Sequence, residues 1–189
     1  MRFLEDLMHK TINYKMEINM TAYMKVNGNS ELEGDITATG LEKTTQLLSA
    51  GFSVSRNMNT QVGSVKTREG TKPSVSEFEI SKEVDKTSPY LARDSATGMT
   101  IPSIEIKFVN TGKDLSIYHV VKLYDVLVSG YSIDYDDQGS KTDAASAKPT
   151  ERITLNFTKF EITNTPHGKD HKAGSPITAG YDLETARPL

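Results

Sequence analysis

The sequence of 189 residues contains no cysteine, which excludes a disulfide framework, a cysteine-ligated zinc site, a thiol nucleophile and a dithiol redox motif. It has no apolar run of about 18 residues and therefore predicts no membrane-spanning helix. Neither sign of charge dominates, because 22 Lys and Arg residues stand against 25 Asp and Glu residues, for a net charge of −3. We therefore expect no polybasic surface for nucleic acid.

The first 19 residues lack the continuous apolar stretch and the small-residue cleavage site of a Sec signal peptide. We expect any export to use a machine that does not read such a signal. A regular strand pattern is expected only after Met20, so residues 1–19 are interpreted as an N-terminal extension, disordered or not native, ahead of one domain at 20–189. The alternative is a docking arm, whose short helix would carry four apolar residues on one face: Phe3, Leu4, Leu7 and Met8.

Alternation of apolar and polar residues predicts a mainly β protein. The expected strands lie at residues 23–26, 48–54, 77–84, 104–108, 117–128, 153–162 and 177–183. One helix is expected, with Ser88 as its N-cap, Pro89 as its first residue and Gly98 at its end. We expect a twisted antiparallel β-barrel or two-sheet sandwich with one α-helix, because closure removes exposed strand edges.

Three of these strands carry more specific predictions. In the second strand, four residues are expected to share one face: Leu48, Ala50, Phe52 and Val54. Residues 117–128 are apolar on both faces, which predicts a central strand buried on both sides. A one-residue slip in the alternation near Thr158 predicts a β-bulge or a sharp twist. Two long polar loops are expected at 56–73 and 136–149.

Two segments have a weak likeness to metal sites. His167 and His171 have the i, i+4 spacing of a zinc pair, but the flanking proline and glycine are incompatible with the helix that this spacing needs. Residues 134–139 fit a calcium loop loosely, but Ala145 stands where the bidentate carboxylate is required. We interpret both as solvated loops.

The sequence offers no catalytic group in a convincing setting. His119 lies within a predicted strand and is interpreted as a partly buried structural histidine, since no nucleophile or orienting acid converges on it. Three carboxylates share one strand face, which we interpret as solvated or, alternatively, as a contact with Lys or Arg of a neighbouring subunit: Glu77, Glu79 and Glu83. We expect no enzyme activity, no cofactor and no bound metal.

Residues 76–106 carry the most specific pattern in the chain. A strand leads to D-K-x-S-P-x-L at 85–91, which starts a helix, and a strand with alternating Ile104 and Ile106 follows. Further blocks are Y-x-K within 21–26, LYDVLVSGY at 123–131, ERITLNFTKF at 151–160 and the closing strand at 180–183. Together they resemble the Hcp family (hemolysin-coregulated protein), the inner-tube subunit of the type VI secretion system. One departure is the second strand, where only Phe52 stands for the aromatic residues that the family often carries.

This resemblance, which covers about residues 20–189, implies a structural protein with a fold like that of phage tail tubes. It implies that six copies form a ring and that rings stack into a hollow tube. The implied partners are other copies of the chain, a VgrG spike, contractile sheath proteins and small effector proteins in the lumen. Assembly would take place in the cytoplasm, followed by secretion or delivery through the type VI machine. The alternative is a tail-tube protein of a phage or phage-like contractile particle.

The resemblance also implies roles for particular residues. Ser53 falls at a position expected to face the lumen, where a small polar side chain leaves room for cargo. The loop at 56–73 is expected to contact the next ring, ordering on assembly. Its candidate stacking residues are Val62, Val65, Lys66, Arg68 and Lys72.

Overall fold

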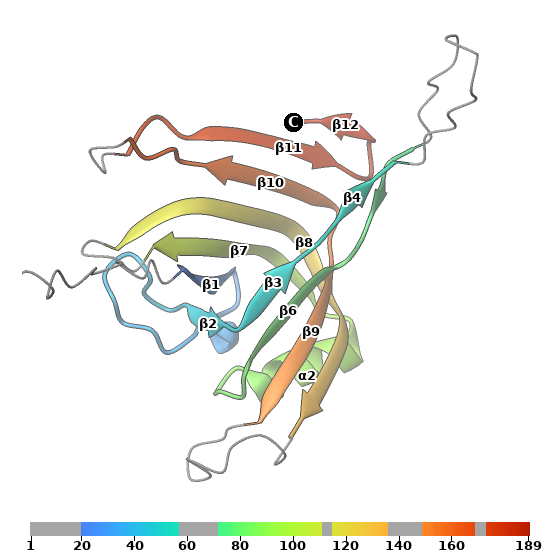
Figure 1. Ribbon diagram of the computed structural model, residues 1–189. Coiled ribbons are helices and arrows are strands. Elements are labelled where there is room, and N and C mark those ends of the chain that lie inside the picture. The colour runs from blue at the N-terminus through green and yellow to red at the C-terminus, as the bar shows by residue number, and fades with distance from the viewer. Residues whose placement is uncertain (1–19, 57–71, 111–114, 136–148, 169–172) are drawn as a thin grey trace, which may run out of the picture.

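The computed structural model describes residues 20–56, 72–110, 115–135, 149–168 and 173–189. Its strands are β1 (Met20–Asn27), β2 (Thr45–Leu47), β3 (Ser49–Gly51), β4 (Val54–Ser55), β5 (Ser74–Val75), β6 (Phe78–Glu83), β7 (Thr100–Asn110), β8 (Ser116–Asp134), β9 (Thr150–Asn156), β10 (Lys159–Asn164), β11 (Ile177–Asp182) and β12 (Arg187–Pro188). The short 3-10 helix η1 (Ser30–Leu32) and the α-helix α2 (Ser88–Thr97) complete the described elements (Figure 1). The prediction of a mainly β, antiparallel protein with one α-helix is confirmed.

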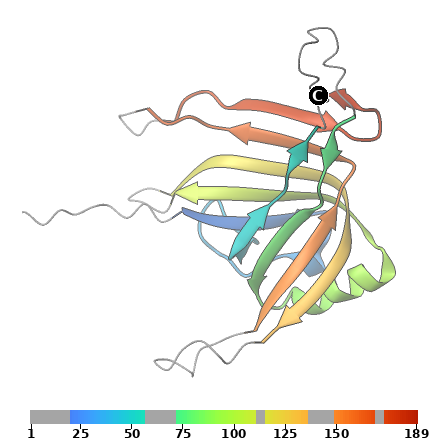
Figure 2. The same cartoon turned by 45° about the vertical axis from the view of Figure 1, so that its right-hand side comes forward.

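The long strand β8 is the hub of the sheet. One of its edges pairs with β7, and the other pairs with β10 along its first half and with β9 along its second half. From β7 the sheet continues through β1 to β2, and from β9 it continues through β6 to β3. These two arms meet at Leu48, the one residue between β2 and β3, so the sheet curls into a barrel-like wall that the chain itself joins at that point (Figure 2).

Local bends allow β8 to pair with three strands, β7, β9 and β10. Asp125 has a positive φ of 49°, and the pairing with β9 slips one residue between Val128 and Gly130. Bulges of this kind bend a strand and increase its twist. The slip predicted near Thr158 is confirmed as a change of phase, since the strand is interrupted between Asn156 and Lys159 and both Phe157 and Phe160 are buried. It is not a β-bulge, because the pairing with β8 keeps its register from one side of the break to the other. Beyond the wall, β10, β11 and β12 extend the sheet.

The core consists of the inward-facing residues of this wall. Four aromatic rings meet at one end of it, with the Phe52 ring 5.3–6.0 Å from the other three: Phe78, Phe157 and Phe160. The strand predictions place most core residues correctly: Phe78, Ile80, Ile104, Ile106, Ile153, Leu155 and Phe157 are all buried.

Two strand predictions are wrong in part. Leu48 and Val54 are 56% and 54% exposed, because the predicted single strand at 48–54 is broken into short pieces. At the first break the Leu48 N–H donates to the Ser81 carbonyl oxygen at 2.8 Å, and its side chain turns to solvent. β8 is not buried on both sides either, since Leu127 is 37% exposed after the bend at Asp125.

We predict that Leu155→Ala lowers the free energy of unfolding by about 2–5 kcal/mol, because it leaves a cavity among well-packed neighbours. Leu155 is fully buried in β9. Urea unfolding followed by circular dichroism measures the loss, with Leu127→Ala on the exposed part of β8 as the control. Equal losses from the two variants would contradict the assignment of Leu155 to the core.

Candidate assembly surfaces

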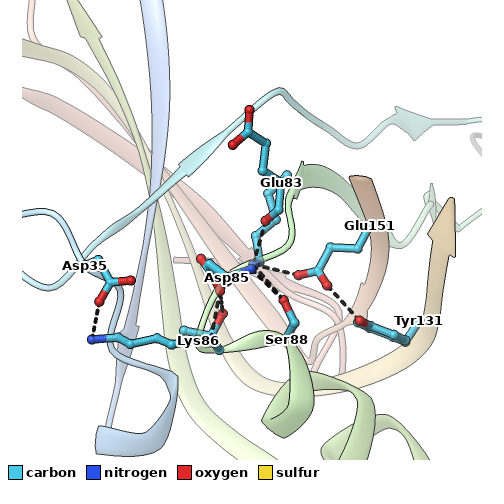
Figure 3. Close-up of polar contacts among 9 residues, drawn as sticks. Asp35, Glu83, Asp85, Lys86, Ser88, Tyr131 and Glu151 are labelled. Atoms are coloured by element: carbon cyan, nitrogen blue, oxygen red, sulfur yellow. Dashed lines mark hydrogen bonds and ion pairs between the residues drawn. The ribbon is translucent and has the colours of Figure 1, made fainter. Parts of the chain in front are cut away.

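The helix α2 is fastened to the wall through one buried lysine. Lys82 takes an inward-facing position of β6 and is fully buried, as is Glu151 on β9. The Lys82 Nζ lies 2.8 Å from Asp85 Oδ1 and 2.6 Å from Glu151 Oε1, and it donates to the Glu83 carbonyl oxygen at 3.2 Å (Figure 3). A buried ammonium group requires such partners, and these contacts compensate for the loss of water around it.

Two further donors hold the carboxylates in place. The Tyr131 hydroxyl donates to Glu151 Oε2 at 2.7 Å, and burial together with this bond raises the pKa of Tyr131 to about 12. Asp85 accepts from the Thr87 N–H at 2.8 Å and from the Thr87 hydroxyl at 2.6 Å. Burial raises the pKa of Asp85, but the contacts with Lys82 and Thr87 outweigh it, so the pKa lies below its usual value. Both carboxylates are thereby positioned to neutralise Lys82.

The prediction that Ser88 is the N-cap of the helix is wrong. Ser88 is the first helical residue, and Thr87 precedes it without a side-chain hydrogen bond to the helix. The Ser88 hydroxyl accepts from the Asp85 N–H at 3.0 Å and lies 3.5 Å from the Lys82 Nζ. The end at Gly98 is confirmed, since Gly98 has a φ of 67° and its N–H donates to the Asp94 carbonyl oxygen at 2.9 Å. The block at 85–91 therefore forms the turn whose Asp85 and Ser88 side chains contact Lys82.

The sequence reasoning did not single out Lys82 and Glu151. The signal was present, because Lys82 is in phase with the buried Phe78 and Ile80, and Glu151 is in phase with the buried Ile153. Charged residues are almost never fully buried unless they are paired, and the pairing of β6 with β9 cannot be read from spacing along the chain. Two residues of opposite charge, each at an inward-facing position of a different strand, are the sequence pattern that indicates a buried ion pair.

We predict that Lys82→Met lowers the free energy of unfolding by about 3–5 kcal/mol, because it leaves two carboxylates without their cation. The matched control is Lys86→Met, which removes an exposed ion pair with Asp35 of 2.6 Å and should cost about 0–1 kcal/mol. Guanidinium unfolding curves of the two variants measure the difference. A loss for Lys82→Met no greater than that of the control would show that the buried cluster does not hold the fold.

The face of the wall opposite the core is polar. Strands β3, β6, β9 and β8 form a shallow groove there of about 690 Å³. Its polar lining comes from Ser49, Glu79, Ser81, Ser132, Arg152 and Thr154. Gly130 lies within it, and a side chain at that position would meet the Thr154 hydroxyl at 3.1 Å. The groove presents hydroxyl groups and both signs of charge to water, without a nucleophile and base brought together.

A second surface, at the base of the β4–β5 hairpin, is apolar. The hairpin pairs Val54 with Val75 and projects from the wall (Figure 2). Below it lies a groove of about 280 Å³ between the hairpin and the β10–β11 pair. Its apolar lining comes from Val54, Pro73, Val75, Phe160 and Tyr181. An apolar surface beside a projecting hairpin is typical of a protein contact.

Two residues with predicted assembly roles lie beside this hairpin: Ser53, predicted to face the lumen, and Lys72, a candidate stacking residue. Ser53 is exposed between β3 and β4, where its N–H donates to the Ser76 hydroxyl and its carbonyl oxygen accepts from the Ser76 N–H, both at 2.9 Å. Lys72 is exposed at the start of the segment that leads into β5. Four predicted stacking residues lie outside the described residues: Val62, Val65, Lys66 and Arg68. The lumen-facing role of Ser53 stays a prediction.

The candidate chemical residues do not converge. His119 is half-buried, and its ring centre lies 5.4 Å from that of Phe108, which fits a structural role. Glu77 is exposed and accepts from the Asn156 side chain at 3.3 Å. His167 is exposed, whereas His171 and most of the 134–145 segment lie outside the described residues. Across the parts of the chain that the structure describes, no three His, Asp or Glu side chains are placed to hold a metal ion.

Comparison with known proteins decides the family. The sequence model of the family described as "Type VI secretion system effector, Hcp" matches residues 23–163. The chain belongs to the Hcp family, the tube proteins of the type VI secretion system. The resemblance read from the blocks at 85–91, 123–131 and 151–160 is thereby confirmed. Hcp proteins are structural and secreted and are not an enzyme family.

Individual Hcp relatives agree with this assignment. Protein hcp1 of Pseudomonas aeruginosa is 25% identical over 114 residues, which cover 59% of this chain and 66%, just under two thirds, of that protein. A solved structure described as a type six secretion system protein has a TM-score of 0.80 at 21% identity and covers 90% of this chain and 100% of its own. Hcp1 from Salmonella typhimurium has a TM-score of 0.69 at 20% identity, covering 90% and 99%. These structures share the fold of the Hcp chain described above.

In the described parts of this Hcp chain, α2 is the longest helix, and no helix has the length and apolar character that a membrane crossing requires.

Proposed function

We propose that this chain is the repeating subunit of a type VI secretion tube. Six copies form a ring, rings stack into a hollow tube, and the chain carries small effector proteins in the lumen. The observation that carries the proposal is the family match over residues 23–163, joined to a fold that covers the full length of a solved type VI secretion protein. The same match favours type VI secretion over the phage tail-tube alternative.

The distribution of polar and apolar surface supports a wall made of several copies. The sheet has a core on one face and a polar groove on the other, so the second face can stay wet when copies assemble around a bore. The apolar groove beneath the β4–β5 hairpin offers a dry contact for a neighbouring copy. Under this proposal Ser53 faces the lumen, where its small exposed side chain leaves room for cargo.

The remaining partners follow from the same assembly. A VgrG spike would cap the tube, and contractile sheath proteins would surround it. The subunits would assemble in the cytoplasm and leave the cell through the machine itself. The chain would transform no molecule, and it would use no cofactor or metal.

We predict that the purified chain forms rings, which negative-stain electron microscopy and light scattering detect as particles with six times the monomer mass. Assembly is concentration-dependent, so the measurement is made over a series of rising protein concentrations. A protein that stays monomeric throughout the series would contradict the proposal.

We predict that deleting residues 62–72 leaves folding and rings intact but prevents rings from stacking. The segment continues from the β4–β5 hairpin, which already projects from the wall (Figure 1). Electron microscopy gives tube length, and circular dichroism checks the fold. A chain with the same residues replaced by a Gly-Ser linker of equal length is the control for loop closure. Tubes of normal length from the deletion would refute the stacking role.

A further inference from the structure

The polar groove on the wall is hollow because most of the side chains across it are small. The strand register places two rows of residues across β3, β6, β9 and the second half of β8 (Figure 2). The first row is Ser49, Ser81, Arg152 and Ser132, and the second is Gly51, Glu79, Thr154 and Gly130. Seven of these eight residues line the groove of about 690 Å³. A Cβ atom at Gly51 would meet no atom within 4 Å apart from its chain neighbours.

The same face, which we call the groove face, has an excess of carboxylates. Glu77 and Glu79 are both exposed, and Glu77 accepts from the Asn156 side chain on β9 at 3.3 Å. In the part of the wall formed by β3, β6, β9 and the second half of β8, Arg152 is the one basic residue on this face. The Arg152 Nε lies 3.5 Å from Asp134 Oδ2. Asp134 therefore already matches the charge of Arg152, and the two glutamates leave the groove face negative.

The remaining outer part of the wall has the opposite balance of charge. On β1, β7, the first half of β8 and β10, four lysines share the outward face with two glutamates: Lys25, Lys107, Lys122, Lys159, Glu105 and Glu161. Glu105 lies 3.7 Å from both Lys107 and Lys122. The excess of carboxylates is thus a local property of the groove face and does not follow from the net charge of the chain.

A concave surface with one sign of charge acts more strongly than its separate charges. One exposed carboxylate attracts a cation only weakly, because water screens the pair. A cleft lined by one sign focuses the electric field and raises the local concentration of the opposite charge. Under the proposed function the groove face lines a bore, where every copy in a ring presents the same carboxylates. A positively charged polypeptide is attracted to such a surface, and a polyanion is repelled from it.

We propose that the groove face docks lysine- and arginine-rich segments of the proteins that the tube carries. Glu77 and Glu79 attract the ammonium and guanidinium groups, and the serine and threonine hydroxyl oxygens accept hydrogen bonds from them. Gly51 and Gly130 leave space for the segment. The inference rests on the proposed function in taking an exported protein as the occupant, whereas the charge and shape of the groove belong to a single chain.

Binding of a fluorescein-labelled oligolysine peptide to the full chain, followed by fluorescence anisotropy at low salt, tests this proposal. Glu79→Lys should weaken binding about three- to tenfold, since it replaces an attraction by a repulsion. The matched control is Glu184→Lys, which makes the same change of charge in the exposed turn between β11 and β12, outside the groove lining. This control should bind like the unaltered chain. Equal losses from the two variants would overturn the proposal, because the peptide would then respond only to net charge.

A variant with the opposite expected effect guards against a loss caused by misfolding. Arg152→Gln removes the one positive charge of the groove face and should bind the peptide more tightly than the unaltered chain. Rising salt should weaken binding in both proteins. Unchanged or weaker binding by Arg152→Gln would overturn the proposal, as would equally tight binding of an oligoglutamate peptide to the unaltered chain.

Particle mass separates cargo from a neighbouring copy as the occupant of the groove. Glu79→Lys should form the same particles as the unaltered chain. Loss of rings in Glu79→Lys alone would mean that the carboxylate holds a neighbouring subunit, and this would overturn the proposal. If the unaltered chain forms no rings, the proposed function fails, and the peptide comparison still decides the charge preference because the groove lies within one chain.

Discussion

The architecture of this protein depends on the ion pairs that one buried lysine, Lys82, makes with two carboxylates. Lys82 on β6 joins Glu151 on β9 and Asp85 in the turn that leads into α2, so a single cation ties together two wall strands and the helix. One cation faces two carboxylates, and the hydroxyl groups of Tyr131 and Thr87 donate to the carboxylates. A buried pair of this kind gains little over an apolar pair in free energy, but the loss of one partner is costly because it leaves a buried charge uncompensated.

The helix is also held from its outer side. Lys86 lies 2.6 Å from Asp35, and Arg93 lies 2.7 Å from Glu31 in the 3-10 helix. These exposed pairs contribute little each, since water screens them. Their position matters more than their strength, because they connect the segment between β1 and β2 to α2.

The long strand β8 explains how one thin sheet can have a core on one side and a wet face on the other. Its bends at Asp125 and Ser129 let the same strand pair with β7 and β10 and then with β9. The resulting curvature surrounds a core of aliphatic and aromatic side chains, while Ser, Thr and paired charges occupy the opposite face. A subunit with two such surfaces keeps its own core and still offers the polar wall that an open assembly requires.

The period-two pattern determined which stretches become strands and which side chains face the core, because alternation follows directly from the geometry of a strand. Ile104, Ile106, Ile153 and Leu155 were predictable on this basis, as was the slip near Thr158. The sequence blocks at 85–91 and 151–160 that resemble the Hcp family could also be recognised from the sequence alone. What only the tertiary structure decided were the long-range pairings: Lys82 with Glu151, the kink at Leu48 and the role of Ser88 beside Asp85 instead of as a cap. Spacing along a chain carries no information on which strand lies beside which, and a buried charge becomes intelligible only when its partner on another strand is known.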